Sequence, residues 1–245
     1  MGEISLLALL HLCDSLFPTG GFAHSDGLEV ATADGTVASA DALQQWMDVL
    51  LDDSLGRSEA LAVVLAWRAC IDDRTVDLEA LDSLERLDRE VYALRPSSTA
   101  RAASRAMGAR LLKTWWAIHP ELVTKSPPGL RPAGGSSGPG AAAVRVTLPV
   151  AFGGVCASAG IDARAAAGGY IYTRLAATVS SAMRLMPIGQ TEAHALLART
   201  LARVPATLDA IEERVARGDR PGAFAPAFDI ATMAQQHLRS RLFLT

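Results

Sequence analysis

The sequence predicts an all-α fold, a single-domain helical bundle of roughly eight to ten helices, and three observations point to it. Alanine contributes 45 of the 245 residues and leucine 32, whereas the β-branched residues valine and isoleucine together contribute 23. Strong helix formers therefore dominate, and the valine and isoleucine runs of a buried parallel sheet are missing. Apolar residues also recur every three or four positions along most of the chain, as on one face of a helix. A chain of this length buries about 70% of its unfolded surface, which supports one domain over residues 1–245.

Capping residues and apolar spacing place the individual helices. Ser39, Ser97 or Ser98, and Asp162 each precede an apolar-periodic stretch and are expected to act as N-caps. Asp26 is expected to cap a short helix with Glu29 at its third position. The predicted helices run from Ser39 to Leu50, over 58–71, 78–94 and 98–117, from Asp162 to Met186, and over 192–203, 205–217 and 229–242.

Glycines and prolines predict where the bundle departs from regular packing. Gly168 and Gly169 lie inside a long predicted helix, where they favour a close approach of a neighbouring helix. Residues 126–140 hold nine Gly or Pro and three Ser, so we expect a mobile loop within the single domain rather than a second core. Residues 144–148 alternate like a strand but are too few to imply a sheet. The C-terminal helix and tail are expected over 229–245.

Charge and hydropathy exclude several classes of protein. Lys plus Arg (23) is balanced by Asp plus Glu (26) without a basic run, so we expect no nucleic-acid partner. The longest uncharged stretch near membrane-like composition is shorter than the roughly 20 residues of a span, and the N-terminus lacks a basic signal-peptide region. We therefore expect a cytoplasmic chain without a membrane segment, whose three isolated cysteines act as small buried hydrophobes. Residues 1–56 carry nine carboxylates and no Lys or Arg, which indicates solvated helix faces or a basic partner.

One acidic cluster offers an enzymatic alternative. Asp72, Asp73 and Asp77 could chelate magnesium that carries a diphosphate, as in helical prenyl-transferring enzymes with an aspartate-rich motif of similar spacing. The other interpretation is that these residues cap helices, because the cluster lies between two helical patterns and has no second aspartate-rich motif. Release of pyrophosphate from prenyl diphosphates with Mg²⁺, and its loss in Asp73→Ala, would distinguish the two. A nucleophilic site is not indicated, because the chain has no GxSxG elbow and no HExxH motif.

Two segments do not follow an ordinary helical pattern. In residues 17–29, Pro18 and the pair Gly20-Gly21 predict an ordered turn between two helices. In residues 183–191, Pro187 predicts a helix corner at which Arg184 holds carbonyls or a carboxylate.

At these segments the sequence resembles the UreF family of urease accessory proteins. That family typically shows a Pro-x-Gly-Gly-Phe turn, a Ser-x-Gly-Leu-Glu helix start and an Arg-Leu-x-Pro-x-Gly-Gln corner. The matching segments are Pro18 to Phe22, Ser25 to Glu29, Arg184 to Gln190, the central Pro149 to Gly153, and the C-terminal Asp229 to Met233 and Ser240 to Phe243. The likeness runs in the same order from about residue 5 to 244. The chain departs from it at Gln235-Gln236, where the family often has His-Glu, and at Thr147-Leu148, where the family frequently has a histidine.

The resemblance implies an all-helical, non-enzymatic adaptor without a cofactor or a metal ligand of its own. Such proteins form homodimers, bind the accessory protein UreD (also called UreH) and recruit the GTPase UreG, and the assembly delivers nickel to apo-urease. A UreF-like dimer that only scaffolds is a further possibility. The partner-binding residues implied are Gly20, Gly21, Phe22, His24 and Glu29 on one surface, Arg184 and Gln190 on another, and Arg241, Leu242 and Phe243 as a tail that docks onto UreD.

Overall fold

The computed structural model describes residues 2–72, 78–131 and 145–245, without the side chains of 72–82 and 128, and all its regular elements are helical. The predicted all-α, single-domain bundle is thereby confirmed. The α-helices are α1 (Glu3–Cys13), α2 (Leu28–Ala33), α3 (Ala40–Val49), α4 (Ala60–Asp72), α5 (Leu78–Ala93), α6 (Ser98–Ile118), α7 (Leu148–Ser158), α8 (Ala163–Leu185), α9 (Gln190–Leu201), α10 (Val204–Ala216) and α11 (Pro226–Ala234). Short 3₁₀ turns lie at Gly21–Ala23, Pro120–Lys125, Pro128–Leu130 and Gln235–His237.

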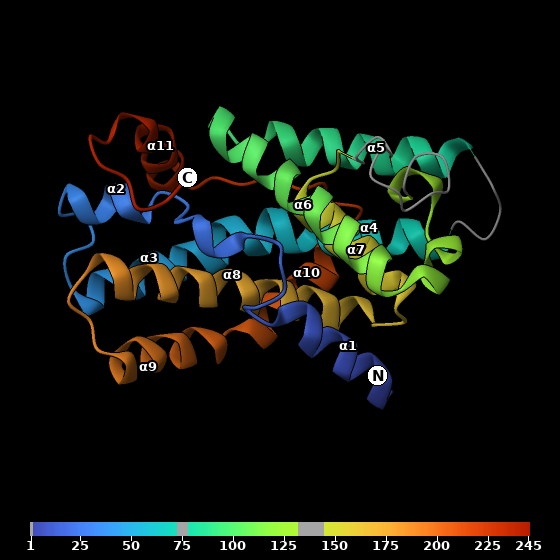
Figure 1. Cartoon of the computed structure of the whole chain (residues 1–245), viewed down its shortest axis with the longest axis horizontal. Coiled ribbons are helices and arrows are strands. Elements are labelled where there is room, and N and C mark those ends of the chain that lie inside the picture. The colour runs from blue at the N-terminus through green and yellow to red at the C-terminus, as the bar shows by residue number, and fades with distance from the viewer. Residues whose placement is uncertain (1, 73–77, 132–144) are drawn as a thin grey trace.

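The centre of the bundle is formed by α4, α7 and α8, which pack on one another. Gly153 of α7 lets the two backbones approach, because a Cβ there would lie 2.4 Å from the carbonyl oxygen of Val63 in α4. Around this centre, α5 and α9 lie along opposite edges of the molecule (Figure 1). α1 packs on α8 and projects at one end, and the C-terminus lies beside α2 and α11 (Figure 1).

The predicted N-caps at Ser39, Ser97 and Asp162 are confirmed. Each side chain accepts a hydrogen bond from the backbone N–H three residues later, at 3.2, 3.3 and 2.8 Å respectively. These contacts satisfy amide donors that the first helical turn leaves without a carbonyl partner. Local sequence therefore determines where α3, α6 and α8 begin.

The break predicted between residues 50 and 58 is wrong, because a π-helix over Leu50–Glu59 joins α3 to α4. π-helical segments are rare and often occur at functional positions. Gly56 lets the methyl group of Thr207 approach, since a Cβ at that position would lie 2.8 Å from it. The segment ends at Glu59, whose carboxylate is buried.

The two glycines of α8, Gly168 and Gly169, differ in how closely other helices approach them. A Cβ at Gly169 would lie 2.7 Å from Leu9 and 2.9 Å from the Cys13 sulfur, so α1 approaches α8 closely there. At Gly168 a Cβ would meet only Leu208, at an ordinary 3.5 Å. Burial raises the pKa of the Cys13 thiol to about 12, which keeps it protonated and agrees with a packing role.

The Gly/Pro-rich segment is described only in part. Residues 126–131 pack against the bundle, where Leu130 is fully buried and its carbonyl accepts a hydrogen bond from Trp116 Nε1 at 2.9 Å. The rest of the loop predicted over 126–140 lies outside the described residues. Among the helices that are described, none has both the length and the apolar composition that a membrane crossing requires.

Candidate functional site: the glycine turn and the C-terminal tail

Residues 18–24 between α1 and α2 form a tight turn, here called the glycine turn. Gly20 has φ +80°, a left-handed conformation that favours glycine. The Arg110 guanidinium lies against it, 2.8 Å from where a Cβ would be. Phe17 is buried beneath the turn, whereas Phe22 at its tip is 69% exposed. The turn thus presents one aromatic side chain to solvent from a fixed backbone.

The helix that follows is not capped by Asp26, contrary to the prediction. Its N-cap is Gly27, at φ +85° and without a side-chain hydrogen bond. The Asp26 carboxylate instead pairs with Arg174 of α8, 148 residues away. A long-range charge therefore takes the carboxylate away from its local capping role.

Asp26 belongs to a charge network that also contains Glu59, Arg95, Tyr170 and Arg174. Arg174 pairs with Asp26 and lies 3.6 Å from Glu59, while Arg95 pairs with Glu59 and lies 4.0 Å from Asp26. The Tyr170 hydroxyl donates to Glu59 at 2.6 Å. Burial alone would raise the pKa of Asp26, but the two arginines lower it below its ordinary value. Two carboxylates and two guanidiniums thus balance in a largely buried cluster.

Sequence reasoning missed this network entirely. Its members come from the loop before α2, the π-helix, the α5–α6 connection and α8. The one available signal was a set of charged residues inside otherwise apolar helical patterns, among them Glu59 before an apolar run and Arg174 within α8. Such a signal does not say which residues pair.

The tail, residues 238–245, docks onto its own chain beside the glycine turn. Glu29 accepts hydrogen bonds from the backbone N–H of Leu242 at 2.6 Å and of Phe243 at 3.2 Å. The backbone N–H of Leu244 donates to the carbonyl oxygen of Ala23 at 2.8 Å. These contacts hold the tail in an extended conformation. The last helix therefore ends at Ala234, before residue 242, and the helix predicted over 229–242 is too long.

Arg184 joins the glycine turn to the tail. Its guanidinium lies 4.3 Å from the centre of the Phe243 ring and donates to the carbonyl oxygen of Phe22 at 3.4 Å. Phe243 is buried under it, whereas Arg241 and Leu242 remain exposed. The turn, Arg184 and the tail, which the sequence assigned to three surfaces, therefore meet at one place.

Gln190 stands apart from this cluster. It is exposed at the first position of α9, after the corner at Pro187 that the sequence predicted. None of the contacts described above involves it.

A groove between α1 and α8 continues from the turn. Its volume is about 710 Å³, and Leu10, Phe17, Phe22, Tyr172 and Arg174 are among the residues that line it. The side chains of α1 that face solvent beside the groove are mostly apolar. They include Ile4, Leu6, Leu7 and Leu10. Exposed apolar side chains gathered along one helix are typical of interaction surfaces.

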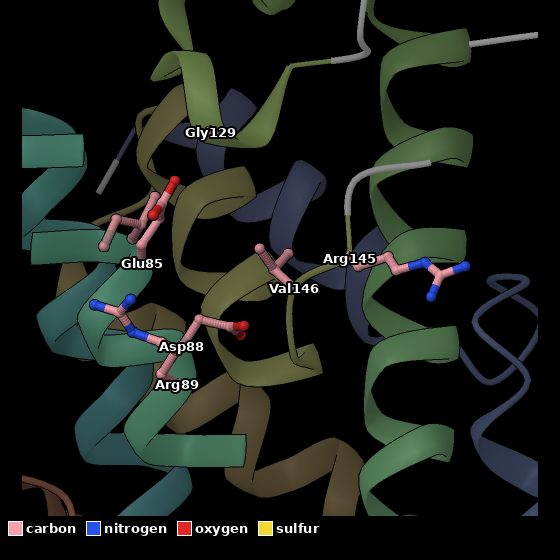
Figure 2. A pocket seen from close by; sticks show the side chains of 7 residues that line it. Glu85, Asp88, Arg89, Gly129, Arg145 and Val146 are labelled. Atoms are coloured by element: carbon pink, nitrogen blue, oxygen red, sulfur yellow. The ribbon is translucent and has the colours of Figure 1, made fainter. Parts of the chain in front are cut away.

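A second, smaller cavity of about 280 Å³ lies between α5 and residues 145–146 (Figure 2). Glu85, Asp88 and Arg89 line it from α5, and Figure 2 shows Arg145 turned away from them. The Asp88 carboxylate already has a partner within the chain, since it accepts a hydrogen bond from the backbone N–H of Thr147 at 2.6 Å. Its carboxylate thereby positions the residue that precedes α7.

The alternative magnesium site is not addressed by the structure. Asp72, Asp73 and Asp77 lie outside the residues whose side chains are described. Among the side chains that are described, no three or more His, Cys, Asp or Glu are arranged to hold a metal ion.

His24 links the turn to Thr245 and is the titratable group of that contact. Its Nδ1 lies 2.7 Å from the Thr245 hydroxyl. Burial lowers the pKa of His24; Asp26 opposes this shift and nearby arginines support it. The folded state therefore binds fewer protons than the unfolded chain, so the stability that neutral His24 contributes is complete above pH about 6.5 and is lost as the pH falls below it.

We expect the free energy of unfolding to fall, by at most about 1.4 kcal/mol per pH unit, as the pH drops from 6.5 to the lowered pKa of folded His24. Urea unfolding at pH 7.5 and 5.5 measures it, with His24→Gln as the comparison because glutamine does not titrate in this range. Equal pH dependence in both proteins would exclude His24 as the cause.

Comparison with known proteins identifies the family. The UreF family model matches residues 37–201. The urease accessory protein UreF of Cereibacter sphaeroides (strain ATCC 17025 / ATH 2.4.3) is 31% identical over 98% of this chain and 99% of its own length. That of Paenarthrobacter aurescens is 29% identical over 98% and 97%, and that of Bacillus sp. (strain TB-90) is 26% identical over 98% and 99%. The chain therefore belongs to the UreF family of urease accessory proteins.

Proposed function

We propose that this protein is a non-enzymatic, cytoplasmic adaptor for nickel insertion into urease. In this proposal it forms a homodimer, binds UreD (UreH) and recruits the GTPase UreG, and the assembly acts on apo-urease. The observation that carries it is the convergence of Phe22, Arg184 and the tail on one exposed surface. Exposed aromatic and arginine side chains held by a fixed backbone are typical anchors of protein–protein interfaces.

The test is capture of separately expressed UreD and UreG by the purified protein, after circular dichroism has shown that it is helical. Capture of neither partner would refute the adaptor proposal. In this proposal the tail contacts the partner through exposed residues that include Arg241 and Leu242, while Phe243 anchors the tail to its own chain.

We expect Phe22→Ser to weaken capture of at least one partner by about 30-fold or more in Kd, as for an interface hot spot. Phe22 is 69% exposed, so its loss costs the fold little. The matched control is Phe224→Ser, because Phe224 is 78% exposed but lies on the segment that Gly222 anchors to Arg57. Equal affinity of both variants, measured by biolayer interferometry, would exclude the glycine turn from the interface.

For the homodimer we propose the apolar face of α1 beside the groove. A second copy is the occupant, because an isologous contact covers the same apolar patch on both chains at once. We expect Leu7→Glu to yield a monomer in light scattering after size-exclusion chromatography, since Leu7 is 65% exposed and a charge there would be buried in the dimer. Phe224→Glu should remain dimeric. A dimeric Leu7→Glu would place the interface elsewhere.

A further inference from the structure

Asp26 has an unusual backbone conformation. Among the described residues it is the non-glycine position with a positive φ, at 50°. L-residues with a Cβ occupy this left-handed region at a cost in free energy that glycine avoids. Strained positions of this kind persist where the surrounding structure holds them, and they cluster at functional sites.

This conformation shapes the site that holds the tail, here called the seat, which is formed by Ala23, Ser25, Asp26 and Glu29. The backbone N–H groups of Ser25 and Asp26 both donate to the main-chain oxygen of Thr245, at 2.5 and 3.2 Å. Gly27 follows, also left-handed at φ +85°, and the chain then enters α2 with Glu29 facing the tail amides. Two successive left-handed residues thus direct the backbone N–H groups of Ser25 and Asp26 and the Glu29 carboxylate toward the tail.

Charged residues distant in sequence hold Asp26 in place. Arg174, whose side chain is 6% exposed, pairs with its carboxylate, and Arg95 lies 4.0 Å away. Arg174 is fixed in turn by Glu59 at 3.6 Å, and Glu59 is fixed by the Tyr170 hydroxyl. Arg174 and Tyr170 also line the α1–α8 groove.

We propose that Arg174 is a positioning residue for the tail. Through its pair with Asp26 it keeps that residue left-handed, and the left-handed residue keeps the seat of residues 242–245 formed before any partner arrives. The inference deepens the proposed function, on which it rests for the role of the tail in partner binding. The seat itself is a property of this chain alone.

The test compares Asp26→Gly with Asp26→Ala. Both remove the carboxylate and leave Arg174 with Glu59, but only glycine adopts φ near +50° freely. We expect the amides of Leu242, Phe243 and Leu244 to exchange with D₂O within about threefold of wild type in Asp26→Gly and about tenfold faster in Asp26→Ala. Asp26→Asn should fall between, because asparagine tolerates the left-handed region. The Leu175 amide in α8 reports general loosening of the bundle and serves as the internal reference.

Equal exchange in the glycine and alanine variants would overturn the proposal, since a purely structural ion pair does not distinguish them. A second test uses Arg174→Gln, in which we expect faster tail exchange and recovery when Asp26→Gly is added. Absence of recovery in a folded double variant would also contradict the proposal. Pull-down of UreD and UreG with the same variants separates the two proposals. Slow exchange of the tail amides without capture of either partner refutes the adaptor proposal. Capture without a difference in exchange between the glycine and alanine variants refutes the positioning role.

Discussion

Arg174→Met is expected to lower the free energy of unfolding by about 3–5 kcal/mol. Methionine keeps the length and apolar body of the side chain but leaves Asp26 and Glu59 with Arg95 as their remaining charge partner. Two carboxylates then share a largely buried site with one guanidinium, and an uncompensated buried charge is costly. Asp26 and Glu59 also raise the pKa of Arg174 against the effect of its burial, so the guanidinium is firmly charged in the folded protein. Urea unfolding followed by circular dichroism measures the loss.

Arg203→Met is the matched control. Arg203 also pairs with two carboxylates, Asp48 at 2.7 Å and Asp52, but its side chain is 43% exposed. Water and salt screen such a pair, and its loss should cost at most about 1 kcal/mol. Similar losses in the free energy of unfolding for the two variants would show that the buried charge network stabilises the fold no more than an exposed ion pair does.

Gly153→Ala is expected to destabilise the protein by about 2–3 kcal/mol, which corresponds to a fall in Tm of roughly 5–10 °C. The added Cβ would lie 2.4 Å from the carbonyl oxygen of Val63 and 3.0 Å from the Cβ of Ala66. The obstacle is backbone of α4, so α4 and α7 must separate along the central contact of the bundle. Alanine's better helix propensity offsets only about 1 kcal/mol of that strain. Differential scanning calorimetry measures the effect.

Gly168→Ala supplies the comparison, because it makes the same change inside a helix where the new Cβ meets only Leu208 at 3.5 Å. It should be neutral or stabilising by up to about 1 kcal/mol. A loss in Gly168→Ala as large as in Gly153→Ala would mean that the close approach of α4 and α7 is not the cause.

Local features of the fold were predictable from the sequence. Ser39, Ser97 and Asp162 cap helices because their partners lie three residues away. The turn at Gly20 and the corner at Pro187 likewise follow from residues with restricted or permissive backbones.

The predictions that were wrong concern features that depend on contacts distant in sequence. Asp26 does not cap α2 because its carboxylate pairs with Arg174. The last helix ends before residue 242 because Glu29 binds the backbone amides of the tail. The π-helix at Leu50–Glu59 has no local signal either, since its course is set by packing and by the burial of Glu59. For the candidate site, the motif residues were recognisable but their convergence was not, because nothing in the spacing relates Arg184 to Phe243.

Reconstitution of urease tests the central proposal most directly. Apo-urease, UreD, UreG, GTP and Ni²⁺ are combined with and without this protein, and urea hydrolysis is measured. We expect activation to depend on the protein and to drop strongly with Phe22→Ser but not with Phe224→Ser. Equal urease activity with and without the protein would contradict the account.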